Sequence, residues 1–323
     1  MSGLDSFSLA FRLARATQEA AIAAASKMGY GDKELADQAA VEAFRKELNS
    51  LGVSGEVVIG EGERDEAPML YIGEKFGLGG VEVEMAVDPL ENTNATAYGR
   101  ENAIAVCALA PKGGLFKAPD MYMEKLAVSE AAAEVVSLDY PVEKNLKNIA
   151  EALDRKVSDL VIVVLDRPRH EKLIAEIRQA GARIRLIPDG DLAAALAVGV
   201  RGSGVHALMG IGAAPEGVIS AAGLRCLKGR FWGRFWPKNK AERKRMKEMG
   251  VKENKIYSME ELASGKWLIV AATGVTNGTL LKGVRLFGGG ARTQSLVMTT
   301  EPHLIQFLDT THVYDKKEIE FRL

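Results

Sequence analysis

Short apolar strands alternate with helices between residues 160 and 227, and this alternation constrains the fold more than any other feature of the sequence. Runs rich in Val, Ile and Leu are each followed by residues at helical spacing: 160–165 then 170–180, 183–187 then 192–198, and 205–209 then 215–227. Alternation of this kind is typical of right-handed βαβ units. It predicts an α/β domain with a largely parallel sheet.

The first part of the chain has a different pattern. Apolar positions recur at helical spacing over 6–27 and 33–49, which predicts two helices separated by a glycine break. The predicted strands here are 56–59, 81–87 and 103–110, the last turning at 112–114 into a hairpin. Two later strands, 266–272 and 294–299, are not assigned to a sheet. A chain of 323 residues is expected to form about two domains, here 1–140 and 141–323, both α/β.

Composition excludes several classes of protein. With 42 Lys+Arg against 43 Asp+Glu, the net charge of −1 offers no general electrostatic attraction to nucleic acid or to an anionic membrane. The longest stretch without charged side chains, 202–215, is too short to cross a bilayer. Cys107 and Cys226 form no metal-binding or disulfide pattern, so we expect a cytoplasmic protein in which Cys107 is a buried small side chain.

Acidic side chains collect where predicted strands end. The run Asp88-Pro89-Leu90-Glu91-Asn92-Thr93 places two carboxylates and a hydroxyl in one short segment, which Pro89 stiffens. Asp88 and Glu91 could bind one hard cation while Thr93 orients a water beside it. A plain acidic turn explains the same residues equally well.

Two further acidic segments strengthen the case for a metal. One contains Glu61, Glu63, Asp65 and Glu66, and the other contains Asp32 and Asp37. Mg²⁺ and Mn²⁺ take several oxygen ligands, which carboxylates from different segments supply without histidine. Taken singly, each of these residues is also explained as a solvated helix residue or a helix cap.

Glu216 lies in a glycine-rich stretch, 209–217, which leads into a predicted helix that begins at Pro215. Backbone amides at such a helix start are able to receive an anion. Pro215 occupies the place of the third glycine in a dinucleotide-binding fingerprint, and this disfavours a Rossmann dehydrogenase.

Charged residues also follow two predicted strands of the α/β domain. Arg167 and Arg169 end one strand and suit a phosphate, whereas Asp189 and Asp191 end the next and suit sugar hydroxyls. Adjacent strand ends of this kind form the usual ligand crevice of an open sheet. The alternative is that all four are solvated loop charges.

A basic and aromatic segment, 228–247, leaves two interpretations open. Its nine Lys and Arg, with Phe231, Trp232, Phe235 and Trp236, could bind nucleic acid. The favoured interpretation is a solvated helix whose neighbouring aromatics pack against the core or against a second subunit.

Taken together, these segments resemble the class II fructose-1,6-bisphosphatases of bacteria, and most closely the cyanobacterial type that also hydrolyses sedoheptulose 1,7-bisphosphate. The similarity covers nearly the whole chain. The matching stretches are 31–33 with 36–37, 58–74, 86–89, 118–126, 167–170, 188–191 and 212–217.

The resemblance implies the fold and the reaction. The fold is the α/β sugar-phosphatase fold shared with inositol monophosphatases, with two sheets in a layered α-β-α-β-α arrangement. The reaction is hydrolysis of the C1 phosphate of a ketose bisphosphate with two or more Mg²⁺ or Mn²⁺ ions. A homo-oligomer, dimer or tetramer, is expected, without a nucleic-acid or membrane partner. An inositol-monophosphatase-like enzyme or a nucleotide 3′-phosphatase of the same fold is the alternative.

The resemblance also implies site residues. Metal ligands are expected at Asp37, Glu61, Asp88, Glu91 and Glu216. Substrate contacts are expected at Glu91, Asn92, Thr93, Tyr122, Arg167, Pro168, Arg169, Asp189, Gly190, Asp191 and Ala213. The catalytic candidates are Thr93, Asp65 and Lys33, with the Thr93 hydroxyl orienting the attacking water and donating to Asp65 or Asp32.

One position departs from the family pattern. Asn92 stands where the D-P-x-E/D-G-T turn has glycine. Because Asn tolerates a positive φ better than most residues, we expect the turn to survive.

Overall fold

The computed structural model describes residues 6–60 and 70–314, and the chain forms two compact units. The first unit contains residues 1–109 and 267–323, and the second contains 110–266. The boundaries differ from the predicted division at 140/141. Residues 110–140 belong to the second unit, and the C-terminal part of the chain returns to the first. The protein is a mixed α/β structure with two sheets.

The first unit is built on an eight-stranded sheet. Its strands are β1 (Val53–Ile59), β2 (Lys75–Phe76), β3 (Val81–Glu91), β4 (Ile104–Pro111), β11 (Ile269–Gly274), β12 (Arg285–Phe287), β13 (Gly290–Thr300) and β14 (His303–Val313). The order is β12-β13-β11-β4-β3-β1-β2, and β14 pairs with β13. This pairing answers which sheet the late strands join, because β11 lies between β4 and β13.

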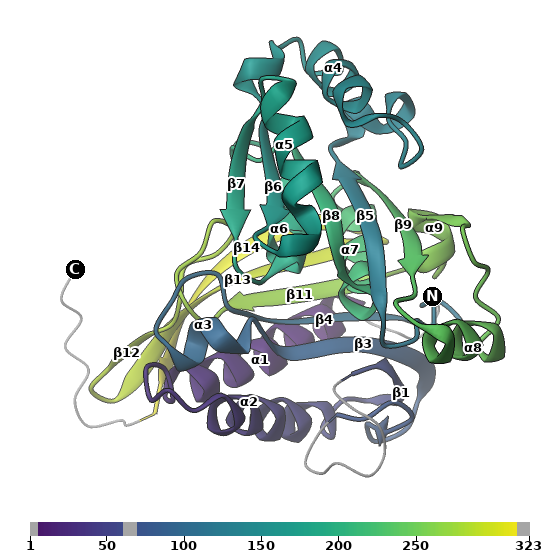
Figure 1. Ribbon diagram of the computed structural model, residues 1–323. Coiled ribbons are helices and arrows are strands. Elements are labelled where there is room, and N and C mark those ends of the chain that lie inside the picture. The colour runs from purple at the N-terminus through teal and green to yellow at the C-terminus, as the bar shows by residue number, and fades with distance from the viewer. Residues whose placement is uncertain (1–5, 61–69, 315–323) are drawn as a thin grey trace. The chain divides into compact units, whose positions relative to one another are not determined.

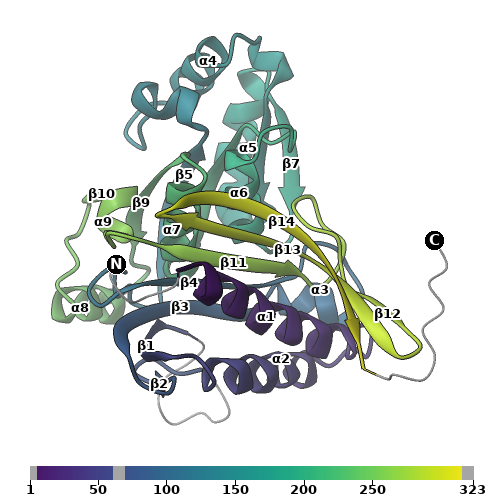
Figure 2. The same cartoon turned by 180° about the vertical axis from the view of Figure 1, so that it is seen from behind.

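Two helices cover one face of this sheet. The predicted pair is confirmed as α1 (Ser6–Ala25) and α2 (Lys33–Leu48), and α2 begins where the Asp32 side chain accepts a hydrogen bond from the Leu35 N–H at 3.0 Å. The buried face of α1 consists largely of leucine and alanine, and α1 lies against β3, β11 and β13 (Figure 2). Small side chains allow this close approach.

The hairpin predicted after residues 112–114 is wrong. Strand β4 pairs antiparallel with β11 in the first unit, whereas the next strand, β5 (Tyr122–Val128), belongs to the sheet of the second unit. Residue spacing alone misses this crossover, because a glycine turn after a strand is compatible with either destination.

The second unit contains a six-stranded sheet (Figure 1). Its strands are β5, β6 (Val161–Leu165), β7 (Arg183–Ile187), β8 (Ala207–Ala213), β9 (Arg230–Trp236) and β10 (Ile256–Ser258), in the order β10-β9-β5-β8-β6-β7. Strand β6 is parallel to β7 and β8, but β5 is antiparallel to β8 and β9, and β9 is antiparallel to β10. The sheet is therefore mixed, which corrects the expectation of a largely parallel one.

Helices cover both faces of the six-stranded sheet. The helices of this unit are α4 (Val142–Ala152), α5 (Glu171–Gln179), α6 (Asp191–Gly199), α7 (Ala214–Cys226), α8 (Lys240–Glu248) and α9 (Met259–Leu262). Apolar residues of α4 and α5 share one core with Leu126 and Val128 of β5, and α6 and α7 pack on the opposite face. The predicted βα alternation from 160 to 227 is confirmed. No helix in residues 6–60 and 70–314 is long and apolar enough to span a membrane.

Candidate active site

In the first unit, the candidate site lies at the carboxyl end of β3. The strand runs on to Glu91 instead of ending at Val87 as predicted. Strand β3 pairs with β1 only as far as Ala86. Pro89 lies beyond this last pair, so the N–H that proline lacks is not needed for a hydrogen bond to β1. The Asp88 Oδ1 accepts a hydrogen bond from the Leu90 N–H at 3.1 Å. This contact holds the Asp88 carboxylate at the start of the segment.

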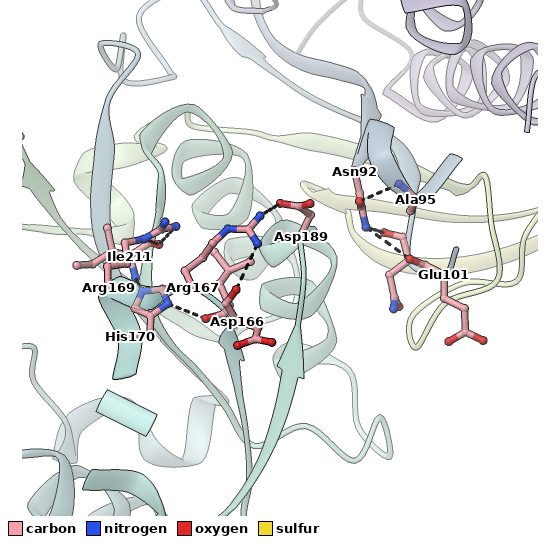
Figure 3. A network of polar contacts seen from close by, with 11 residues as sticks. Asn92, Ala95, Glu101, Asp166, Arg167, Arg169, His170, Asp189 and Ile211 are labelled. Atoms are coloured by element: carbon pink, nitrogen blue, oxygen red, sulfur yellow. Dashed lines mark hydrogen bonds and ion pairs between the residues drawn. The ribbon is translucent and has the colours of Figure 1, made fainter. Parts of the chain in front are cut away.

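Asn92 adopts the left-handed conformation that the family glycine would take. Its φ is 68° and its ψ is 53°. The side-chain oxygen accepts a hydrogen bond from the Ala95 N–H at 3.2 Å, and the Nδ2 donates to the Asn102 carbonyl at 3.3 Å (Figure 3). Asn92 therefore caps the short helix α3 (Thr93–Ala97) and ties the turn to the following loop. The expectation that the turn survives is confirmed.

Thr93 is the first residue of α3. Its hydroxyl donates to the Leu90 carbonyl at 3.1 Å. The proposed pairing of this hydroxyl with Asp32 is not present, because the proton is taken by the Leu90 carbonyl and Asp32 caps α2. Asp65, the other acceptor considered, lies outside the described residues, as do Glu61, Glu63 and Glu66.

Backbone hydrogen bonds bring the start of α2 beside α3. The Gly31 N–H donates to the Ala97 carbonyl at 2.8 Å, and the Gly29 N–H donates to the Thr96 carbonyl at 3.0 Å. Exposed Lys33 begins α2, and half-buried Asp37 lies one turn further along. The first unit thus joins the helix carrying Lys33 and Asp37 to the segment carrying Asp88, Glu91 and Thr93.

In the second unit, the two arginines after β6 have different partners. The Arg167 Nη2 donates to the Asp189 carboxylate and its Nη1 to the Asp166 carbonyl at 3.3 Å (Figure 3). The Arg169 Nε and Nη2 both donate to the Ile211 carbonyl, at 3.0 and 2.8 Å. Arg169 is therefore fixed against β8, while Arg167 neutralises an acidic residue at the end of β7.

Tyr122 is the centre of a cluster of cations and aromatics. The Arg169 Cζ lies 4.5 Å from the centre of the Tyr122 ring, and the Lys238 Nζ lies 3.5 Å from it. Trp236, the cross-strand neighbour of Tyr122 on β9, stacks at 6.3 Å. Cations over a ring are attracted by its quadrupole, and two of them at one ring create a concentrated positive charge. Sequence reasoning did not single out Lys238, although the basic and aromatic segment that contains it was the signal.

The remainder of the basic and aromatic segment has a structural role. Phe231 and Phe235 are buried, and Phe235 contacts Phe116 and Tyr257. Helix α8 contains five of the nine Lys and Arg, and four of these five are exposed. The interpretation of a solvated helix with aromatics packed on the core is confirmed for these residues.

His170 is buried, and its ring connects the loop of residues 167–169 to strand β8 by a hydrogen bond. Its Nδ1 contacts the Leu165 carbonyl at 2.7 Å, and its Nε2 accepts a hydrogen bond from the Ile211 N–H at 2.7 Å (Figure 3). The proton of the neutral ring is thereby assigned to Nδ1. Burial lowers the pKa of His170, despite the opposing contact with the Leu165 carbonyl. Gly210 leaves room for the ring, because a Cβ there would lie 3.0 Å from Nε2.

Asp191 is the first residue of α6 and forms a buried ion pair. It follows Gly190, whose φ of 85° requires the left-handed region, and its Oδ2 is 2.7 Å from the Lys125 Nζ. Lys125 lies on β5, and sequence reasoning missed it as a functional residue. The available signal was a lysine that alternates with the apolar residues Met123 and Ala127 on one face of the strand.

Glu216 lies in the first turn of α7, which begins just after Ala213. Its Oε2 is buried and has no hydrogen-bond partner among the described residues. Burial raises the pKa of Glu216, and nearby Asp191 raises it further, whereas Lys125 opposes the shift. A buried carboxylate oxygen without a donor suits a cation ligand.

The predicted site residues thus fall into two sets. The first unit contains Lys33, Asp37, Asp88, Glu91, Asn92 and Thr93, and the second contains Tyr122, Arg167, Pro168, Arg169, Asp189, Gly190, Asp191, Ala213 and Glu216. Within the part of the chain that the structure describes, no three His, Cys, Asp or Glu residues gather closely enough to hold a metal. Taken unit by unit, the donor chemistry suits a hard cation: the first unit carries the Asp88 and Glu91 carboxylates on β3, and the second carries the buried Glu216 oxygen.

The two cysteines take no part in either set. Cys107 lies on β4 and Cys226 ends α7, and both side chains are buried thiols. Burial raises the pKa of each thiol to about 12. The interpretation of Cys107 as a buried small side chain is confirmed.

Comparison with known proteins identifies the family. Residues 7–312 match the family described as bacterial fructose-1,6-bisphosphatase, glpX-encoded. A protein of Synechococcus sp. (strain JA-3-3Ab), named D-fructose 1,6-bisphosphatase class 2/sedoheptulose 1,7-bisphosphatase, is 51% identical over 96% of this chain and 97% of its own length. Proteins of the same name from Crocosphaera subtropica (48%, over 97% of this chain and 99% of their own) and Synechocystis sp. (47%, over 96% and 98%) are also similar. The chain belongs to the bacterial, glpX-encoded fructose-1,6-bisphosphatase family.

Proposed function

We propose that this chain hydrolyses the C1 phosphate of fructose 1,6-bisphosphate to give fructose 6-phosphate and phosphate, and likewise converts sedoheptulose 1,7-bisphosphate to sedoheptulose 7-phosphate. Family membership makes it a phosphoric monoester hydrolase of carbohydrate metabolism. The structural observation that carries the proposal is the left-handed turn at Asn92, where the chain passes from β3, which bears Asp88 and Glu91, into α3, which begins at Thr93. The family match favours a sugar bisphosphate over an inositol monophosphate or a nucleotide 3′-phosphate.

The finer fold assignment belongs to the same proposal. We assign the chain to the inositol monophosphatase-like fold with α-β-α-β-α layers. Two features support it: a helix pair on one face of the eight-stranded sheet, and helices on both faces of the six-stranded sheet.

Carboxylates would hold two or more Mg²⁺ or Mn²⁺ ions. The proposed ligands are Asp37, Glu61, Asp88, Glu91 and Glu216. The buried Oε2 of Glu216 supports this assignment, because no described residue donates to it. When bound, such ions neutralise the phosphoryl oxygens and the leaving alkoxide and lower the pKa of a coordinated water.

Thr93 would orient the attacking water. Its hydroxyl proton is already given to the Leu90 carbonyl, so the remaining lone pairs of Oγ1 are left to accept a hydrogen bond from that water. Asp65, which lies outside the described residues, stays a proposed catalytic residue beside Thr93 in this scheme. Lys33, at the exposed start of α2, would supply positive charge to the phosphoryl group.

Residues of the second unit would hold the distal part of the substrate. Tyr122 and Arg169, with Lys238 beside them, present the positive charge that a distal phosphate needs. Sugar and phosphate contacts are further assigned to Asn92, Arg167, Pro168, Asp189, Gly190, Asp191 and Ala213. Binding energy gained far from the reacting phosphorus then aligns the C1 phosphate for attack.

Phosphate release tests the proposal. The two sugar bisphosphates are assayed separately with Mg²⁺, with Mn²⁺ and with EDTA. We expect release from both substrates that depends on the divalent metal. Absence of release from either substrate, by folded protein saturated with metal, would contradict the proposal. Light scattering of the same preparation tests the proposed dimer or tetramer. We also propose that the protein is located in the cytoplasm.

A further inference from the structure

Lys125 is a charged side chain in the interior of the second unit. It is 1% exposed and lies on β5 with Met123 and Ala127, on the face that α6 and α7 cover. Burying an ammonium group is unfavourable unless a counter-ion and hydrogen bonds replace water. The partner is Asp191, and the two side chains are 1% and 8% exposed. The pair is therefore shielded from solvent.

Glycines provide the space for this pair. A Cβ at Gly212 would lie 2.0 Å from the Asp191 Oδ2 and 2.9 Å from the Lys125 Nζ. A Cβ at Gly217 would lie 2.7 Å from the Met123 Sδ and 3.6 Å from the Lys125 Cε. Two glycines of the stretch 209–217 thus lie beside the buried charge pair, and Gly212 in particular leaves the room that it needs.

The pair restricts how Asp191 meets a ligand. The backbone of Asp191 is fixed at the start of α6, directly after Gly190 in the left-handed region. Its Oδ2 is held by Lys125, and no described residue donates a hydrogen bond to its Oδ1. One oxygen of the carboxylate is therefore anchored, and the other is left for a hydrogen-bond donor.

We propose that Lys125 is a positioning residue for sugar recognition, because its ammonium group holds the Asp191 carboxylate in the orientation that accepts a hydroxyl of the ketose phosphate. The inference rests on the proposed function, which assigns Asp191 to the sugar. Without Lys125, the carboxylate has no counter-ion and is free to rotate, so substrate binding must order it. A site whose groups are already ordered binds more tightly.

A double-mutant cycle tests this inference. KM and kcat for fructose 1,6-bisphosphate are measured at saturating Mn²⁺ for the unaltered chain, Lys125→Met, Asp191→Asn and the double variant, together with the metal concentration for half-maximal activity. Lys147→Met is the matched control, because Lys147 pairs with Glu143 on the surface with its side chain 61% exposed. Thermal unfolding of each variant sets an assay temperature at which all are folded.

We expect Lys125→Met and Asp191→Asn each to raise KM about tenfold, with kcat changed less than about threefold. The double variant should have the KM of Asp191→Asn, within about twofold, because Lys125 affects sugar binding through Asp191. Lys147→Met should leave KM unchanged. The metal concentration for half-maximal activity is measured beside KM, because Lys125 and Asp191 also shift the pKa of Glu216, a proposed metal ligand.

Two results would overturn the inference: a KM for Lys125→Met equal to that of the unaltered chain, or effects that multiply to about a hundredfold in the double variant. A weakened metal requirement without a change in KM would also overturn it. Should Lys125→Met fail to fold with Asp191 buried and unpaired, a double variant whose KM exceeds that of Asp191→Asn by more than about twofold would still overturn the inference. An unchanged KM in Asp191→Asn would contradict the proposed role of Asp191 instead.

Discussion

The Nε2 of His170 accepts a hydrogen bond from the Ile211 N–H at 2.7 Å, which joins the loop after β6 to the strand β8. The ring must be neutral at Nε2 to accept this bond. Protonation would replace an acceptor by a donor facing another donor, so the contact is lost when the imidazole becomes charged.

The stability of the protein should therefore fall in mild acid. Burial lowers the pKa of His170 in the folded chain, and it also lowers the pKa of His206 and His312. The unfolded chain binds more protons below the ordinary histidine pKa of about 6.5, so the free energy of unfolding is fully retained above that pH and decreases below it. Urea unfolding at neutral pH and in mild acid measures how steeply the free energy of unfolding changes with pH.

His170→Gln should reduce this pH dependence. The substitution removes the titrating ring and weakens the contact with Ile211, at a cost of about 1–3 kcal/mol at neutral pH. The contribution of His170 to the change of the free energy of unfolding with pH should vanish, while the contributions of His206 and His312 remain. An unaltered slope in the variant would show that His170 does not titrate between the folded and unfolded states.

Asp88→Asn should abolish turnover while preserving the turn. An amide oxygen can still accept the Leu90 N–H that now contacts the Asp88 Oδ1, but the negative charge for a cation is gone. We expect kcat to fall at least about a hundredfold at saturating metal. The exposed Glu34→Gln in α2 is the control and should retain activity. Unchanged turnover in Asp88→Asn would remove it from the proposed ligands.

Arg169→Ala and Lys238→Ala should each raise KM for a substrate with two phosphates much more than KM for a substrate with one. Both cations lie over Tyr122, so losing either weakens binding of a distal phosphate and leaves a substrate with one phosphate little affected. We expect KM for fructose 1,6-bisphosphate to rise about tenfold or more, and KM for p-nitrophenyl phosphate to change less than about twofold. Lys240→Ala, at the exposed start of α8, is the matched control. Equal effects on both substrates would contradict the assignment.

Asn92→Gly and Asn92→Ala should separate backbone conformation from side-chain contacts. Glycine adopts the φ of 68° freely, so it should cost only a few tenths of a kcal/mol beyond the lost contact with Asn102. Alanine is strained there and removes the cap, for a loss of about 2 kcal/mol. Thermal unfolding measures both changes. Equal stability of the two variants would mean that the left-handed turn is not maintained.

Local sequence signals predicted the parts of the structure that local interactions determine. The two N-terminal helices follow from apolar spacing and from Asp32, which caps α2. The left-handed turn at Asn92 follows from a residue type that tolerates positive φ, whereas the continuation of β3 to Glu91 was not predicted. These features depend on residues within a few positions of each other, and so they can be deduced from the sequence.

Pairings between distant segments could not be deduced in this way. Strands β5 and β9 form the antiparallel half of the second sheet, but Lys125 and Arg234 interrupt their apolar pattern. Each charge is compensated by a residue remote in sequence, Asp191 for Lys125 and Glu124 for Arg234. The role of Lys238 beside Tyr122 likewise depends on cross-strand contact.

The order in which a ribosome makes this chain has a consequence for the first sheet. Strand β4 is complete at Pro111, yet its antiparallel neighbour β11 begins only at Ile269, after the second unit has been synthesised. At ordinary rates of translation this interval is roughly 10 to 30 seconds. Throughout it, one edge of β4 lacks its native partner, although the strand is apolar and buried in the finished protein. The nascent chain therefore has a period in which β4 is open to wrong pairing, and a chaperone that shields this edge should raise the yield of folded protein.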